Sequence, residues 1–259
     1  MRRNVGIFNG EGGTIGTYVG KDAVVVVDTQ FPNTARICLD GIKAKTGGRA
    51  ADLVIDTHFH GDHTGGNATF KAAGAKTIVA HAKVPELMKL RPRPDRPPPT
   101  PPDATFSDTW RKDLGDDVVS ATFYGPAHTG GDIVVLFERA NVAHMGDLVF
   151  NRLHPFVDRQ GGASIAGWIA VLEQVMKAHG ADTIFVFGHA GEKFPVTGGR
   201  VDLQYQRDYF TALLAFTRKA KQAGQARDTF IKTATPLPGF EDHGPLIELV
   251  TSAAWDELS

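Results

Sequence analysis

The sequence is poor in cysteine. Its 259 residues include only Cys38, so a disulfide within the chain is impossible. Small secreted folds that depend on disulfides are thereby excluded, and a single thiol is typical of a reducing compartment. The segment MRRNVGIFNGEGG at the start also lacks the apolar stretch of a signal peptide. We therefore expect a cytoplasmic protein, or a periplasmic or secreted one if a leader has been removed.

A charge imbalance and long apolar runs are also missing. The chain has 28 Lys and Arg against 29 Asp and Glu, and it shows no basic stripe of the kind that nucleic-acid-binding proteins carry. None of its apolar runs approaches the roughly 18 residues that a membrane-spanning helix needs. We expect a small-molecule substrate, with no nucleic acid and no membrane as partners. Composition leaves the oligomeric state open.

What the sequence does contain is a series of short apolar runs. Residues 23–27 form a continuous β-branched run, which favours a strand buried on both faces. The turn at Gly20 to Asp22 joins it to a preceding strand. A helix is expected over residues 34–45, with Asn33 as its N-cap. ADLVIDTHF and KTIVAH predict further strands, with a short helix after the first and a helix near residues 84–90 after the second.

A proline-dense segment, RPRPDRPPPTPPD, lies near mid-chain and cannot form a helix or an inner strand. After it, strands are expected at VVSATFY, DIVVLFE, NVAHMGD and DTIFVFGH, and helices over residues 165–178 and about 203–224. Since each half supplies strands and then helices, we predict one domain over residues 1–259, with two pseudo-symmetric halves joined near residues 91–102. The expected fold class is α/β (α+β), with two sheets face to face and helices outside. A doubly wound parallel sheet is the alternative, although the early hairpin argues against it.

The stretch VIDTHFHGDHTGGN, residues 54–67, concentrates imidazoles and carboxylates. His58 and His60 are two residues apart at a strand end, where side chains at i and i+2 share a face, so both can reach one metal ion. Asp62 and His63 are adjacent where the chain turns, so they can point to a second ion beside the first. Imidazole and carboxylate groups are ligands for zinc, and also for iron or manganese.

Four ligands do not complete two metal sites, and three more candidates follow apolar strands. They are His128 in GPAHTGGD, Asp147 in HMGDLVF and His189 in FVFGHAGE. A single histidine at a strand end is often only a polar loop residue. Seven such groups, each placed where loops gather at a sheet edge, favour a metal centre.

This set, His-x-His-x-Asp-His and then His, Asp and His at strand ends, resembles the metallo-β-lactamase superfamily from about residue 12 to residue 189. The resemblance implies an αββα four-layer sandwich, in which Asp28 has a structural role. It also implies which residues hold each of two metal ions. The first ion takes His58, His60 and His128, the second takes Asp62, His63 and His189, and Asp147 bridges both.

The activity that the resemblance implies is zinc-dependent hydrolysis, with two Zn²⁺ per chain and with Fe or Mn as alternatives. A metal-bridging hydroxide would attack a small carbonyl substrate such as a lactam, lactone, ester or thioester. Asp62 would orient that hydroxide and take its proton, and is therefore the expected catalytic residue. Promiscuous, β-lactamase-like activity is compatible with the same site.

Departures from one large group of true β-lactamases narrow this expectation. Asp147 stands where those enzymes bridge the metals with cysteine, and Phe150 stands where they carry a lysine that grips the carboxylate of the drug. Arg152 is a candidate substitute for that lysine, and with Phe150 and Phe156 it suits a small molecule with an apolar part and an anion.

Two other functions stay open. The first is a mononuclear iron-dependent oxidoreductase resembling the persulfide dioxygenases, which keep the full motif but use only the residues matching His58, His128 and Asp147 for their iron. The second is a metal-dependent binding protein without turnover.

The remaining polar residues are expected to be structural. Asp56 either orients a ligand or makes a strand-end hydrogen bond, and Cys38 belongs to the core. His154 either overhangs the site or packs on the surface. The other histidines outside the metal set are His81, His144, His179 and His243.

Overall fold

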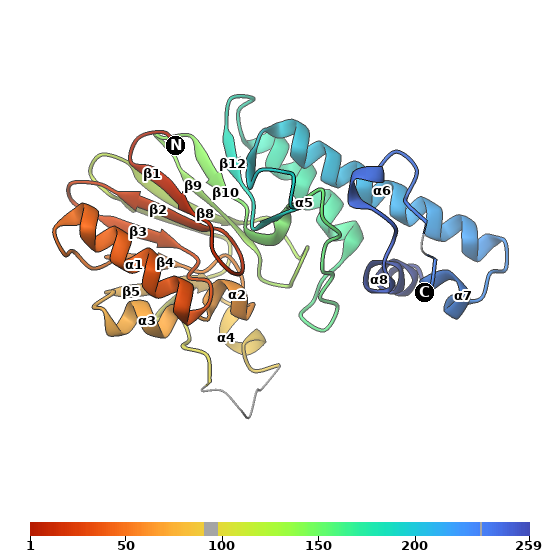
Figure 1. Cartoon of the computed structure of the whole chain (residues 1–259), viewed down its shortest axis with the longest axis horizontal. Helices are drawn as coiled ribbons and strands as arrows, with labels where there is room; N and C mark the ends of the chain where they lie inside the picture. The colour runs from red at the N-terminus through yellow and green to blue at the C-terminus, as the bar shows by residue number, and fades with distance from the viewer. Residues whose placement is uncertain (91–97, 234) are drawn as a thin grey trace.

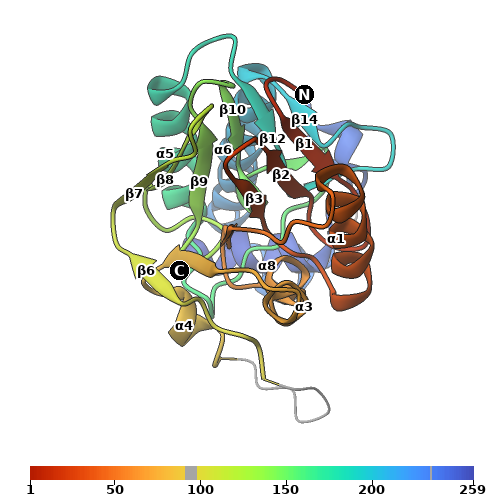
Figure 2. The same ribbon diagram turned by 90° about the vertical axis from the view of Figure 1, so that its left-hand side faces the viewer.

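Two six-stranded sheets pack face to face, and helices cover their outer faces (Figures 1 and 2). The structure, a computed structural model, describes residues 1–90, 98–233 and 235–259. The first sheet has the order β1-β2-β3-β4-β5-β6, and the second has the order β14-β12-β10-β9-β8-β7. A short pair, β11 and β13, lies beside them. The predicted αββα sandwich is confirmed.

The strands of the first sheet are β1 (Val5–Phe8), β2 (Ile15–Val19), β3 (Val24–Val27), β4 (Leu53–Ile55), β5 (Thr77–His81) and β6 (Ala104–Phe106). Those of the second are β7 (Thr109–Asp113), β8 (Val118–Phe123), β9 (Ile133–Phe137), β10 (Val142–His144), β12 (Ile184–Val186) and β14 (Thr197–Gly198). The short pair is β11 (Phe150–Asn151) with β13 (His189–Ala190). The helices are α1 (Pro32–Thr46), α2 (Gly61–Thr64), α3 (Asn67–Ala72), α4 (Val84–Leu87), α5 (Ile165–Ala178), α6 (Arg200–Gln222), α7 (Arg227–Ile231) and α8 (Glu248–Glu257), with single 3₁₀ turns η1 (Gly146–Leu148) and η2 (Glu241–His243).

The four valines of β3 show why the layers form. Because side chains alternate along a strand, Val24 and Val26 pack with α1, while Val25 and Val27 pack between the sheets. All four are fully buried, as the continuous run predicts. The doubly wound alternative is wrong, because β1, β2 and β3 pair antiparallel and the strands divide between two sheets.

The outer face of the second sheet is covered by α5 and α6 (Figure 2). Trp168 of α5 is the largest fully buried side chain, and its Nε1 donates a hydrogen bond of 2.9 Å to the carbonyl of Leu148. Its ring centroid lies 4.6 Å from that of Phe210 in α6 and 5.4 Å from that of His128. Trp168 therefore joins the outer core to the turn that carries a predicted ligand.

Element boundaries depart from prediction in several places. The N-cap of α1 is Phe31, with Pro32 as the first helical residue, so the prediction of Asn33 as N-cap is wrong. Proline is favoured at this position because its fixed φ suits the helix and its missing N–H is not needed there. The α4 helix ends at Leu87. Strands β6 and β7 and helices α7 and α8 were not predicted at all.

The chain passes from one sheet to the other between β6 and β7. The proline segment precedes β6, and its residues 91–97 lie outside the described residues. Within the described part of the chain, no helix is both long and apolar enough to cross a membrane.

Trp168→Ala should lower the free energy of unfolding by about 3–5 kcal/mol, since it leaves a large cavity in a packed core. Val201→Ala, on the exposed face of α6 where Val201 is 72% exposed, should change it by no more than about 0.5 kcal/mol. Urea denaturation of both variants measures the difference. Similar values for the two would show that Trp168 is not a core anchor.

Candidate metal centre

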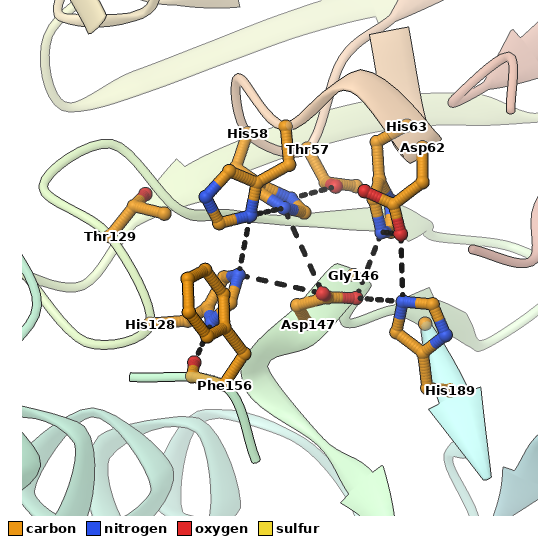
Figure 3. A network of polar contacts seen from close by, with 12 residues as sticks. Thr57, His58, Asp62, His63, His128, Thr129, Gly146, Asp147, Phe156 and His189 are labelled. Carbon is orange, nitrogen blue, oxygen red and sulfur yellow. Dashed lines mark hydrogen bonds and ion pairs between the residues drawn. The ribbon is translucent and has the colours of Figure 1, made fainter. Parts of the chain in front are cut away.

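All seven predicted ligands meet at one edge of the sandwich and form two groups that share Asp147 (Figure 3). Within each group the ligand atoms lie within 4.8 Å of one another. The first group is His58, His60, His128 and Asp147, and the second is Asp62, His63, Asp147 and His189.

The ligands come from segments that follow strands, but not from the strands themselves. The β4 strand ends at Ile55, so His58 and His60 lie in the loop after it, and the expectation that they share a strand face is wrong. They converge through different nitrogens, because Nε2 of His58 lies 3.1 Å from Nδ1 of His60. Asp62 and His63 belong to the single-turn helix α2. Asp147 belongs to η1, directly after β10.

Asp147 occupies the bridging position, because its two carboxylate oxygens face different groups. Its Oδ2 lies 3.4 Å from Nε2 of His128 and 3.9 Å from Nε2 of His58. Its Oδ1 lies 2.9 Å from Nε2 of His63 and 3.4 Å from Nε2 of His189. Among the described residues only Asp147 is shared by the two groups, which matches the bridging role that the family resemblance implies.

Hydrogen bonds on the far side of each imidazole direct its remaining nitrogen into the centre. Nδ1 of His63 donates to Oδ2 of Asp28 over 2.7 Å. The hydroxyl of Thr57 also donates to this carboxylate, over 2.8 Å, and accepts from Nδ1 of His58 over 3.1 Å. Because a carboxylate can only accept here, Nδ1 of each ring carries a proton, which leaves Nε2 as the nitrogen that faces the cluster. The structural role expected of Asp28 is thus to orient His63.

Two further orienting groups were not predicted from the sequence. Nε2 of His60 donates to Oδ2 of Asp158 over 2.9 Å. Nδ1 of His128 donates to the carbonyl of Phe156 over 2.7 Å, as Figure 3 shows. His60 therefore presents Nδ1 to the centre, whereas His128 presents Nε2. Asp158 is 98 residues from His60 in the sequence. No local pattern identifies such a partner.

Close backbone approach around the centre requires glycine at two positions. A Cβ on Gly13, in the NGEGGT turn, would lie 2.1 Å from Cε1 of His63. A Cβ on Gly188 would lie 2.0 Å from Oδ1 of Asp147. The NGEGGT turn, residues 9–14, therefore supports His63 from behind.

The two groups differ in protonation when no metal is bound. Burial opposes the charged form of His63, but the carboxylates of Asp147, Asp62 and Asp28 outweigh it and raise its pKa well above the ordinary value. Burial opposes protonation of His189 as well, yet Asp147 and Asp62 raise its pKa to about 9. These histidines hold protons at neutral pH.

Histidines of the first group behave in the opposite way. Burial is the main cause that lowers the pKa of His128 to about 3, and it also lowers the pKa of His58 well below its usual value. Both rings are neutral at physiological pH. Neutral imidazole is the form that binds a metal ion.

Other residues singled out in the sequence lie outside the centre. Asp56 accepts a hydrogen bond of 2.8 Å from Nδ2 of Asn67, so it makes a structural contact with α3. Arg152 pairs with Asp202 and lies 4.0 Å from the Tyr205 ring centroid, which leaves it a poor substitute for the missing lysine.

The expected structural histidines bond mainly to their own surroundings. Nε2 of His144 and of His81 bond to the carbonyls of Thr14 and Ser107. His154 does not overhang the site, because its ring bonds to the Tyr209 hydroxyl and the Pro245 carbonyl. His179 is the C-cap of α5, and His243 stacks on Tyr209. Cys38 is buried in the core.

The residues of the centre fit a metal ion. Nε2 of His63 and Oδ1 of Asp147 are buried and 2.9 Å apart, but neither has a hydrogen-bond partner of acceptable geometry. Buried polar atoms without partners are rare and call for an explanation, and here both point into the same space. A donor set of imidazole nitrogens and carboxylate oxygens suits zinc, iron or manganese.

Comparison with known proteins gives the same picture. A family model described as the metallo-beta-lactamase superfamily matches residues 10–236. Metallo-beta-lactamase type 2 of Bacillus cereus is 26% identical over 195 residues, which are 73% of this chain and 72% of that protein. The alpha subunit of 2,4-dinitroanisole O-demethylase from Nocardioides sp. (strain JS1661) is 30% identical over 133 residues, which are 51% of this chain and only 39% of that subunit.

A solved structure shares the fold. A metallo-beta-lactamase from Pontibacter korlensis superimposes with a TM-score of 0.65 at 18% identity, covering 80% of this chain and 93% of that one.

Asp147→Ala should weaken metal binding in both groups, because its carboxylate is shared between them. The loss in affinity should be at least the ~10–100-fold that follows when only a hydrogen-bond partner of a ligand is removed. Metal analysis after dialysis measures this, with two equivalents expected for the unchanged protein. An Asp147→Ala variant that still holds two equivalents would show that Asp147 is not a ligand, and Asp208→Ala on the exposed face of α6 is the control.

Zinc affinity of the two groups should respond differently to pH. His63 and His189 must each lose a proton before they can bind metal, so affinity of the second group should rise with pH by about tenfold per unit for each proton released, and the contribution of His189 should end as the pH passes about 9. Affinity of the first group should rise much less, since His58 and His128 are already neutral. Calorimetry in two buffers of different ionisation enthalpy counts the protons released. Equal pH dependence of both binding steps would contradict this assignment.

Proposed function

Because this chain belongs to the metallo-β-lactamase superfamily, we propose that it is a zinc-dependent hydrolase of small carbonyl substrates. Its substrates are lactams, lactones, esters or thioesters, and the site holds two Zn²⁺ per chain. The observation that carries this proposal is the division of the Asp147 oxygens between two complete donor groups.

Zinc bound in such a centre polarises a carbonyl oxygen and lowers the pKa of a coordinated water toward neutrality. The protein residues then bind and orient the reactants. Asp62 is the best placed of them, because its side chain is 28% exposed and so within reach of an entering molecule. Its carboxylate pairs with His189 over 3.1 Å. Burial raises the pKa of Asp62, but His63 and His189 outweigh it and hold it at about 2, so Asp62 stays ionised and accepts hydrogen bonds from a nucleophilic water.

The exposed fractions of the ligand side chains indicate the direction from which a substrate approaches. The side chains of His58, His63 and His128 are fully buried, whereas those of Asp62, His189 and His60 are 28%, 22% and 11% exposed. A substrate therefore meets the centre from the side of these last three residues.

An aromatic wall borders this approach. The ring of Phe156 lies 5.6 Å from that of His60, and Phe150 stacks on His189 with centroids 5.2 Å apart. A carbonyl compound with an apolar part suits this wall.

The rival function is mononuclear iron-dependent oxidation through His58, His128 and Asp147. It needs only these three ligands, whereas here Asp62, His63 and His189 also converge on the other oxygen of Asp147, which supports a second ion. We therefore place hydrolysis first, and we expect weak cleavage of β-lactams to accompany it.

One pair of variants separates the two functions. His63→Ala should empty the second group while the three histidines of the first group, enough for a catalytic zinc site, keep reduced but measurable hydrolysis. His128→Ala should lose more, because it opens the first group. Both variants are assayed with a panel of esters, lactones and β-lactams after loading with zinc, manganese or iron, and for oxygen consumption.

One outcome would contradict the proposed function, and another would contradict the expected division of labour between the two groups. Oxygen uptake that survives in His63→Ala, with no hydrolysis under any metal, would establish the iron-dependent oxidoreductase instead. Complete loss of hydrolysis in both variants would show that two ions are obligatory and that the first group alone does not suffice.

A further inference from the structure

The loop between β11 and α5 directs two of the three histidines in the first group. The Phe156 carbonyl accepts from His128, and the Asp158 carboxylate accepts from His60. The loop also packs on the turn that carries His128, since the amide of Gly130 donates to the carbonyl of Gly161 over 2.7 Å. Any shift of this loop would turn both imidazole rings.

The far end of this loop is held by Glu257, the last residue of α8. Oε1 of Glu257 accepts from the hydroxyl of Ser164 over 2.9 Å and from the amide of Ala166 over 3.1 Å. Its Oε2 pairs with Nη1 of Arg159. The Glu257 side chain is only 10% exposed. It also lies at the N-terminus of α5, where a negative charge is stabilised by the helix dipole.

The position of Glu257 is set by packing elsewhere on α8. Val250 and Ala254 are fully buried in the core that α5 and α6 share. The ring centroid of Trp255 lies 5.3 Å from that of Phe230 in α7. In Figure 1, α8 lies close to α7, below α6. The helix is thus anchored independently of the loop, so Glu257 can act as a fixed point for it.

We propose that Glu257 is a positioning residue for the first metal group. It clamps the loop through Arg159 and Ser164, and the loop in turn fixes the direction of the nitrogens that His60 and His128 present to the ion. This role rests on the proposed function only in taking these two histidines as ligands. The second group provides an internal control, because His63 is oriented by Asp28, which follows β3 in the other half of the chain.

The first measurement needs no metal. NMR of protein labelled with ¹⁵N-histidine reports how fast the imidazole N–H protons of His60, His128 and His63 exchange with solvent. In Glu257→Ala, exchange at His60 Nε2 and His128 Nδ1 should speed up by about tenfold, since these hydrogen bonds would open more often, while exchange at His63 Nδ1 stays unchanged. Glu257→Gln keeps an acceptor for Ser164 and Ala166 and should restore slow exchange.

The second measurement is zinc affinity of the first group alone, in protein that also carries His63→Ala. Adding Glu257→Ala should weaken it about tenfold, the lower end of the effect expected when partners of metal ligands are removed. The matched control is Asp256→Ala on the same helix, which breaks an exposed pair with Arg227 of α7 and leaves the loop contacts in place.

Each outcome either supports or overturns the role proposed for Glu257. Unchanged imidazole exchange in Glu257→Ala, or equal acceleration in Asp256→Ala, would overturn the proposal, the latter by showing a general loss of α8 packing. If Glu257→Ala does not fold, Arg159→Ala removes the Oε2 contact, and wild-type exchange at His60 in that variant would also overturn it. If imidazole exchange responds as expected but the protein takes up no zinc, the proposed function is refuted and the positioning role of Glu257 is retained.

Discussion

The carboxylate of Asp147 is buried among four imidazoles, and the rest of the site depends on how that charge is balanced. A carboxylate so deeply buried is destabilising unless cationic partners surround it. In the metal-free protein His63 and His189 provide that charge as imidazolium groups. Two metal ions would replace these protons with larger charge at the same place. The backbone is shaped to allow this, since Gly188 passes so near Oδ1 of Asp147 that no side chain fits there.

The imidazoles are held in place by acceptors from the two halves of the chain. Asp28 directly follows β3 of the first sheet and orients His63, whereas Asp158 and the Phe156 carbonyl belong to the loop before α5 and orient His60 and His128. The two metal groups therefore depend on different parts of the fold. Their shared carboxylate couples them. Such an arrangement lets one group be weakened while the other persists, which is the basis for comparing variants in the two halves.

Prediction from sequence succeeded where a pattern had a single physical explanation. The valine run of β3 could be stable only as a strand buried on both faces. The α5 helix has its predicted bounds, and the structure shows why it begins there, since the Ser164 hydroxyl accepts from the amide of Gly167 as an N-cap. Prediction failed where the surrounding residues decide the local structure. Asn33 is a good N-cap residue, but the helix already begins at Pro32, the residue before it. The side chain of Asn33 instead donates to Glu11. The short edge strands β6 and β7 carry little apolar periodicity, because much of their surface is exposed.

The sequence by itself determined which side chains can bind metal, since seven imidazole and carboxylate groups at the ends of apolar runs leave few other uses for them. Only the tertiary structure decided which nitrogen each histidine presents to the metal centre, and whether the Arg152 guanidinium is free to bind a substrate. The tautomer of His60 depends on Asp158, almost a hundred positions away, and the availability of Arg152 depends on Asp202 and Tyr205 of α6. Both follow from hydrogen bonds and ion pairs between segments that become neighbours only when the two sheets and their outer helices pack together.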